Sequence, residues 1–103
     1  MTRFRVVIAA RAERHIAAAV TWWRGHRLAA PELLLDEVAE AFELVSTAPR
    51  AGVPYAYRGR AANVRRVLLP RTHYHLYYTV DEPARVVTIR ALWHAARGRG
   101  PAL

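Results

Sequence analysis

The sequence contains no cysteine and no lysine, and it has no long apolar run. Without cysteine there are no disulfides, no thiolate ligands for zinc and no cysteine nucleophile, a composition that agrees with a cytoplasmic protein. No stretch approaches the roughly 18 consecutive apolar residues of a membrane-spanning helix. Near the start, charges flank an apolar run of only five residues, which is too short for a signal peptide. We therefore expect a cytoplasmic protein that does not enter a membrane.

Positive charge is abundant and comes entirely from arginine: sixteen arginines face eight acidic residues, which gives a net charge of +8. Five of the eight acids fall within residues 31–47, so the rest of the chain is more basic than the average. The arginines of this remainder include Arg58, Arg60, Arg65, Arg66, Arg71, Arg90, Arg97 and Arg99. A small domain of this charge is expected to bind a polyanion or an acidic protein partner.

The first part of the chain predicts one strand and two helices. With 103 residues, the protein is long enough for one hydrophobic core and too short for two, so we expect one domain over residues 1–103. A β-branched run at 3–9 predicts a strand. Apolar residues at helical spacing predict a first helix from Ala12 to about Arg24. They are Ala12, Ile16, Ala19, Val20 and Trp23.

A second helix is predicted over roughly 31–47, with Pro31 well suited to its first position. Its acidic residues begin near the N-terminus, where they complement the helix dipole. The expected apolar stripe is Leu34, Leu35, Val38, Ala41, Phe42 and Val45, and the acids expected outside it are Glu32, Asp36, Glu37, Glu40 and Glu43.

Three strands are predicted in the second half, over 63–69, 73–80 and 85–93. The short connections between them are typical of an antiparallel meander, and a further short strand is expected near 53–57. The element order is then β-α-α-β-β-β. We expect an α+β fold in which two helices pack on one face of a small, mainly antiparallel sheet.

The segment "THYHLYYTV" at 72–80 alternates as a strand does. Tyr74, Leu76, Tyr78 and Val80 are expected to face the helices, which leaves His75 and Tyr77 on the opposite face. Near the end of the sheet they are expected to be joined by His94, which follows the last strand, and by arginines of the segment 63–71.

Such a set suits proton transfer at neutral pH. His75 and His94, with one of Arg65, Arg66 or Arg71, would allow RNA cleavage in which a 2′-hydroxyl is activated and the leaving oxygen protonated. The alternative is that both histidines are surface or half-buried residues satisfied by their neighbours. The residues alone leave both interpretations open.

Two other features are weighed in the same way. His73 and His75 alternate as metal ligands do, but no acid lies near them before Asp81, so we expect no metal and no cofactor. Trp22 adjoins Trp23 but lies off the apolar stripe, so it either covers the edge of the core or contacts a partner.

The order of several strings resembles one known family. In the first helix "A...I..A..WW" occurs, followed by "P..GVP", then "VRRVLL...HYHLYYTVD", and finally "VVTIRALWHAARG..P.L". Together they resemble the RelE/ParE superfamily, the plasmid-stabilisation toxins of bacterial type II toxin–antitoxin pairs, from Phe4 to Leu103. This resemblance implies the fold expected above and a co-expressed antitoxin. It also implies one of two activities: RelE-like members cut mRNA on the ribosome without a metal, and ParE-like members inhibit DNA gyrase.

Compared with the RelE-like pattern, His75 occupies a position that is commonly arginine, and His94 fits the basic position after the last strand. Arg66 fits a basic position on an earlier strand. The tyrosine often found near the C-terminus has no counterpart, because no tyrosine follows His94. The resemblance therefore favours the ParE side, with gyrase as target, and leaves mRNA cleavage on the ribosome by His75, His94 and Arg66 as the alternative. A basic RNA- or DNA-binding domain without toxicity is the third reading.

The expected partner is a cognate antitoxin with an acidic, partly disordered segment, in a higher-order toxin–antitoxin complex. That segment is expected to place a helix against the two toxin helices, with Trp22 as one anchor, and an extended stretch along the sheet edge. The partner or target surface is expected to include Trp22, Arg65, Arg71, Tyr77 and Arg97.

Overall fold

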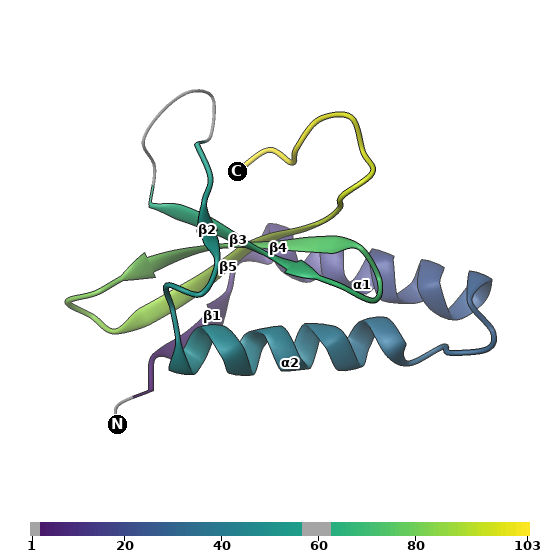
Figure 1. Cartoon of the computed structure of the whole chain (residues 1–103), viewed down its shortest axis with the longest axis horizontal. Coiled ribbons are helices and arrows are strands. Elements are labelled where there is room, and N and C mark those ends of the chain that lie inside the picture. Colours follow the sequence, from purple (N-terminus) through teal and green to yellow (C-terminus); the bar gives the residue numbers. More distant parts are fainter. Residues whose placement is uncertain (1–2, 57–62) are drawn as a thin grey trace.

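The computed structural model describes residues 3–56 and 63–103. Its elements are β1 (Arg5–Ile8), α1 (Ala10–His26), α2 (Leu33–Thr47), β2 (Val53–Pro54), β3 (Val64–Leu69), β4 (Tyr74–Asp81) and β5 (Val86–His94). The strands form one sheet in the order β1-β5-β4-β3-β2, antiparallel except for the parallel pair β1 and β5. Both helices lie on one face of the sheet, and the C-terminal segment crosses the other (Figure 1). The α+β fold and its element order are confirmed.

The prediction that Pro31 opens the second helix was wrong. Helix α2 begins at Leu33, and Pro31 lies in the turn before it. The chain makes this turn with two backbone hydrogen bonds, in which Ala30 donates to the carbonyl of Arg27 and Leu33 donates to that of Ala30. Because this turn extends to Glu32, the helix begins at Leu33, two residues later than predicted.

The main core fills the space between the sheet and the two helices. Tyr74, Leu76 and Tyr78 of β4 all enter it, as the alternation predicted. Trp23 of α1 is also buried there, and its indole N–H donates to the carbonyl of Ala30 at 2.8 Å. Leu35 does not join this core: its side chain is 40% exposed, so its place on the apolar stripe of α2 was wrongly predicted.

A second, smaller cluster lies on the opposite face of the sheet. Val64, Tyr77 and Ala91 are buried in it, and Tyr55, Trp93 and Leu103 pack against them. Tyr77 was expected to be exposed, yet it is only 2% exposed, because Tyr55, and Leu103 of the C-terminal segment, pack against its cluster. The centre of this face is therefore buried, and Tyr77 is not available there as a surface residue.

Glu37 was expected on the outer side of α2 but is 3% exposed. One carboxylate oxygen accepts from the backbone N–H of Arg71 at 2.8 Å; the other accepts from the N–H and the hydroxyl of Thr72 at 3.0 and 2.7 Å. Burial alone raises the pKa of Glu37, but these hydrogen bonds outweigh it and the pKa is lowered. The carboxylate therefore holds the turn between β3 and β4 onto α2.

We expect Glu37→Gln to destabilise the fold by about 3 kcal/mol, because an amide loses the charge and presents N–H groups to donors. The free energy of unfolding in urea measures the change. Glu40→Gln is the matched control, since Glu40 forms an exposed ion pair with Arg71 on the same helix and is expected to cost less than about 1 kcal/mol. Equal losses in the two variants would contradict the role given to Glu37.

Gly52 packs directly on the backbone of β3. Its N–H donates to the hydroxyl of Tyr78 at 2.8 Å, and that hydroxyl donates to the carbonyl of Pro49, also at 2.8 Å. A Cβ atom at Gly52 would lie 2.8 Å from the carbonyl oxygen of Arg66 and 2.6 Å from the Tyr78 hydroxyl. This close approach explains why the "GVP" segment carries glycine at this position.

Gly52→Ala is expected to destabilise the protein by about 2 kcal/mol, since the backbone of β3 or of the Gly52 turn must shift. Gly25→Ala provides the control: no atom lies within 4 Å of its added Cβ, and alanine in a helix is favoured by about 0.5–1 kcal/mol. Thermal unfolding should therefore show opposite changes in melting temperature. A decrease for Gly25→Ala as large as that for Gly52→Ala would contradict the packing argument.

Candidate functional site

A groove of about 890 Å³ runs between α1 and the ends of β4 and β5, and we call it the α1 groove. Its apolar part includes Ala18, Ala19, Trp22, Trp23, Tyr74 and Leu92. Around it lie the basic side chains of His15, Arg27, Arg71, His73, His94 and Arg97. The groove is thus an apolar surface within a basic rim, which is the composition of a binding site for an acidic, partly apolar ligand.

Trp22 is the most exposed large aromatic contact of the α1 groove, at 43%. The ring of His26 stacks on it with 4.3 Å between centroids and 7° between planes, and the guanidinium of Arg27 lies 4.9 Å from its ring. These neighbours hold the indole in place without burying it. Trp22 is thus not part of the buried core, and its contact with a partner stays a prediction.

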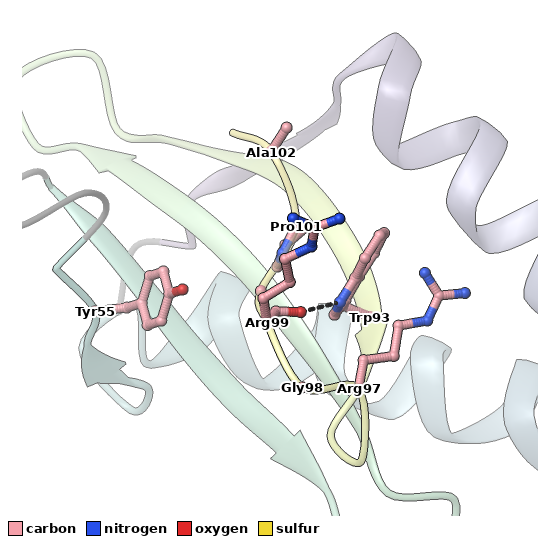
Figure 2. A pocket seen from close by; sticks show the side chains of 8 residues that line it. Tyr55, Trp93, Arg97, Gly98, Arg99, Pro101 and Ala102 are labelled. Carbon is pink, nitrogen blue, oxygen red and sulfur yellow. Dashed lines mark hydrogen bonds between the residues drawn. The ribbon is translucent and has the colours of Figure 1, made fainter.

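A second cleft lies on the opposite face, between the C-terminal segment and the sheet (Figure 2). Trp93 holds the segment by donating its indole N–H to the carbonyl of Arg99 at 2.8 Å, and Arg97 stacks on the same ring at 4.0 Å. Arg11 of α1 holds the end of the chain by donating to the carbonyl of Ala102 at 2.9 Å. These contacts fix the C-terminal segment over the face of the sheet opposite the helices, which we call the outer face.

Arg66, His75 and Tyr77 gather beside this cleft on the outer face. Arg66 donates to the hydroxyl of Tyr77 at 3.4 Å, and its guanidinium lies 5.0 Å from the ring of Tyr55. The rings of His75 and Tyr77 lie 6.1 Å apart. Burial, followed by the charge of Arg66, lowers the pKa of His75. The neutral form of His75 is therefore favoured beside the guanidinium of Arg66.

His94 does not join His75, which was expected of it. It is the last residue of β5 and lies opposite Tyr74, with 5.0 Å between the rings, whereas His75 lies opposite Trp93. Because directly paired residues share a face, the two histidines project to opposite faces of the sheet. The cause is a bulge: Tyr77 pairs with Ala91 and Tyr78 with Ile89, so Arg90 is an extra residue that reverses the alternation beyond it.

The other arginines expected at a functional surface have different environments. Arg65 donates to the carbonyls of Gly52 at 2.8 Å and Arg50 at 3.4 Å, which ties β3 to the preceding loop. Arg71 forms ion pairs with Glu37 and Glu40, so its charge is compensated. Arg58 and Arg60 lie outside the described residues. Arg97 remains at both the groove and the cleft.

His15 was not predicted as a functional residue. Strand β1 pairs with β5 only as far as Ile89, and beyond that point the N–H of Leu92 donates to Nδ1 of His15 at 3.4 Å. Burial, then the charges of Arg11, Arg14 and Arg97, lowers the pKa of His15. In the sequence, the one indication that His15 is partly buried was its position next to Ile16, which lies on the predicted apolar stripe of the first helix.

No three histidine, aspartate or glutamate side chains within residues 3–56 and 63–103 come together as metal ligands would. In the same residues, no helix has the length and apolarity needed to span a bilayer.

The lowered pKa values of His15 and His75 make stability depend on pH. Folding favours the neutral rings. Their contribution to the free energy of unfolding is therefore complete above the unfolded pKa of about 6.5, and it is lost as the pH falls through the lower pKa values of the folded state. We expect the free energy of unfolding in urea to fall between pH 7.5 and 5. His15→Asn, which keeps an acceptor for Leu92, should reduce this fall, whereas Ala17→Asn on the same helix should leave it unchanged. Identical slopes for the two variants would exclude His15 as a contributor.

Comparison with known proteins gives a consistent result. Residues 6–98 match the family model described as the ParE toxin of the type II toxin–antitoxin system parDE. No match was found among curated proteins. Among solved structures, the chain is similar to the toxin–antitoxin complex RelBE2 from Mycobacterium tuberculosis, with 26% identity, a TM-score of 0.65, and coverage of 94% of this chain and 97% of that chain.

Two further structures share the fold. The chromosomal ParDE system from P. aeruginosa matches with 16% identity, a TM-score of 0.67, and coverage of 89% of this chain and 96% of that chain. The isolated E. coli RelE toxin matches with 23% identity, a TM-score of 0.54, and coverage of 92% and 87%. Since the family model covers nearly the whole chain, the protein belongs to the ParE family of toxins of type II toxin–antitoxin systems.

Proposed function

We propose that this toxin arrests bacterial growth by inhibiting DNA gyrase, and that a cognate antitoxin with an acidic, partly disordered segment neutralises it. The observation that carries the choice of target is the separation of His75 from His94 on opposite faces of the sheet. Metal-free RNA cleavage needs a base and an acid on the two sides of one phosphate, and this pair does not converge on a common point. The protein is then expected to act by binding rather than by catalysis.

The outer face has the composition of a protein-binding surface. The guanidinium of Arg97 lies over the ring of Trp93, and Leu68 of β3, which pairs with His75 on the same face, is 47% exposed. Arginine and tryptophan are the residues that most often supply binding energy at protein interfaces. With Arg66 and Arg99, they give a basic and aromatic surface suited to an acidic region of the target.

A ribosome-dependent, metal-independent mRNA endonuclease is the alternative. It is favoured by the contact of Arg66 with the hydroxyl of Tyr77 and by the nearness of His75. An arginine can stabilise a developing phosphorane charge, and a tyrosine or histidine can transfer a proton. Tyr77 is buried under the C-terminal segment, so this activity requires that segment to move. His94 then has no catalytic role, because it lies on the other face.

The antitoxin is expected to reach the sheet edge as well as the helices. Strand β2 pairs only with Arg65 and Arg66 of β3, so the rest of β3, up to Leu69, has no strand partner on that side among the described residues. An extended stretch of the antitoxin can add there as a further strand, with main-chain hydrogen bonds supplying affinity. A higher-order complex then requires that antitoxins bound in this way also associate with one another.

Purified toxin is expected to inhibit supercoiling of relaxed plasmid by gyrase, and its expression should cause filamentous growth that the antitoxin reverses. His75→Ala and His94→Ala should each reduce inhibition by less than about 10-fold, since neither removes a catalytic step. Mapping of mRNA 5′ ends after induction is the parallel measurement, and no cuts within codons are expected.

The nuclease alternative predicts the reverse pattern. Translation then stops at once, mRNA is cut within codons, and His75→Ala slows cleavage by ~10²-fold or more, as loss of a proton-transfer group does. The His94→Ala variant is the matched control on the same chain, because the structure places it away from Arg66. Harmless expression of intact toxin at a verified level would contradict both activities.

A further inference from the structure

The structure describes every residue of the C-terminal segment, which follows β5, and none of them lies in a helix or strand. Side chains hold the segment instead. Trp93 donates its indole N–H to the carbonyl of Arg99 at 2.8 Å, and the guanidinium of Arg97 lies 4.0 Å from the centre of the same ring. Arg11 donates to the carbonyl of Ala102 at 2.9 Å. A segment held by so few contacts can open while the sheet stays folded.

The C-terminal segment covers an apolar part of the outer face. Leu103 packs against the buried cluster of Val64, Tyr77 and Ala91, and Pro101 is itself buried. Release of the segment therefore uncovers this cluster. The accessibility of the cluster to a reagent in solution then measures how much of the protein has the segment released.

His15 of α1 lies beside all three side chains that hold the C-terminal segment. Its ring is 5.4 Å from that of Trp93. Arg11 precedes it by one turn on the same side of α1, and the charges of Arg11 and Arg97 both act on its ring, together with that of Arg14. A change in the charge of His15 thus reaches Trp93, Arg11 and Arg97 at once.

The neutral ring of His15 fits this arrangement and the protonated ring does not. Its Nδ1 accepts from the backbone N–H of Leu92, the residue before Trp93, at 3.4 Å. A protonated ring carries a hydrogen on both nitrogens and cannot accept this bond. Burial, followed by the neighbouring arginine charges, lowers the pKa of His15.

The surroundings of His15 offer no negative charge to a protonated ring among the described residues that line the α1 groove. The charged and titratable side chains that line the groove with it are Arg27, Arg71, His73, Tyr74, His94 and Arg97. An added positive charge at His15 is therefore repelled from the groove side as well as by Arg11 and Arg14 on its own helix.

We propose that His15 is a pH-sensitive switch for the C-terminal segment: protonation of its ring releases the segment from the outer face and uncovers the cluster of Val64, Tyr77 and Ala91. Because the bound segment favours the neutral ring, its binding to the outer face is strongest above a pH of about 6.5 and weakens as the pH falls below that value. Such a switch controls access to the outer face whichever target the toxin binds.

The chain has no cysteine, so one introduced thiol can report on the release. Val64→Cys places a thiol in the covered cluster with little change in volume, and Val45→Cys places one in the main core as the control. Each thiol is labelled with dithiodipyridine in the native protein and in urea at the same pH. The ratio of the rate in urea to the native rate is the protection of the thiol, and it removes the effect of pH on thiol reactivity itself.

Between pH 7.5 and 5, the protection at Val64→Cys is expected to fall at least ~3-fold more than the protection at Val45→Cys, which reports on opening of the whole core. Adding His15→Asn, which keeps an acceptor for Leu92 but takes up no proton, should remove most of this difference. Circular dichroism checks that each variant folds. If Val64→Cys does not fold, Ala91→Cys of the same cluster replaces it, and His15→Gln replaces His15→Asn in the same way.

Two other histidines provide matched controls. His75 lies opposite Trp93 in the sheet, but the charge that lowers its pKa, after burial, is that of Arg66, which does not hold the C-terminal segment. His94 accepts from the N–H of Ala96 at 3.1 Å, at the start of the segment. His75→Asn and His94→Asn should each leave most of the difference between the two thiols in place.

Equal loss of protection at Val64→Cys and Val45→Cys would overturn the proposal, because the whole core would then be opening. Constant protection at Val64→Cys would overturn it as well. The same holds for a difference that persists in His15→Asn, or one that disappears in His75→Asn or His94→Asn.

Discussion

One extra residue in β5 determines how the functional faces of this toxin are built. Up to Ile89, every second side chain of β5 enters the main core. Regular alternation would continue in this way and would place His94 on the outer face. The bulge at Arg90 shifts the pairing by one residue, so Ala91 enters the second cluster and Leu92 returns to the main core. As a result Trp93 reaches the outer face, where it holds the C-terminal segment, and His94 reaches the α1 groove. Without the bulge, His94 would share a face with His75, and the geometry would favour acid–base chemistry.

The α1 groove depends equally on Glu37. A buried carboxylate is tolerated when every oxygen is hydrogen-bonded, and here the donors come from the turn between β3 and β4. That turn carries His73, whose positive φ of 63° keeps the chain close to the end of β5, where Ala95 donates to its carbonyl. By fixing the turn on α2, Glu37 sets the position of the side of the groove that Arg71, Thr72 and His73 form.

Much of the fold could be predicted from local patterns, because strands and amphipathic helices place their apolar residues with a fixed period. The alternation of β4 placed Tyr74, Leu76 and Tyr78 correctly, and the stripe of α1 separated Trp23 from Trp22. The candidate site was harder to predict because it depends on contacts between distant residues. Burial of Tyr77 requires the C-terminal segment, which has no periodic pattern, and the bulge at Arg90 leaves no mark in the composition of β5. Glu37 looks like any outward acid of an amphipathic helix until the turn from Arg71 to His73 is placed beside it.

The arrangement of ion pairs explains how a chain with a charge of +8 acquires a directed surface. Glu32, Glu40 and Glu43 pair with Arg24, Arg71 and Arg3, all of which lie at or near α2. Exposed pairs of this kind add little stability, so their main effect is on where positive charge remains. The arginines left without such pairs among the described residues include Arg27, Arg66 and Arg97, at the α1 groove and the outer face. Two molecules approaching through these surfaces repel each other, whereas an acidic segment is attracted to both. The same charge distribution therefore disfavours self-association through these two surfaces and favours an acidic partner, which can contact the α1 groove without first displacing the C-terminal segment.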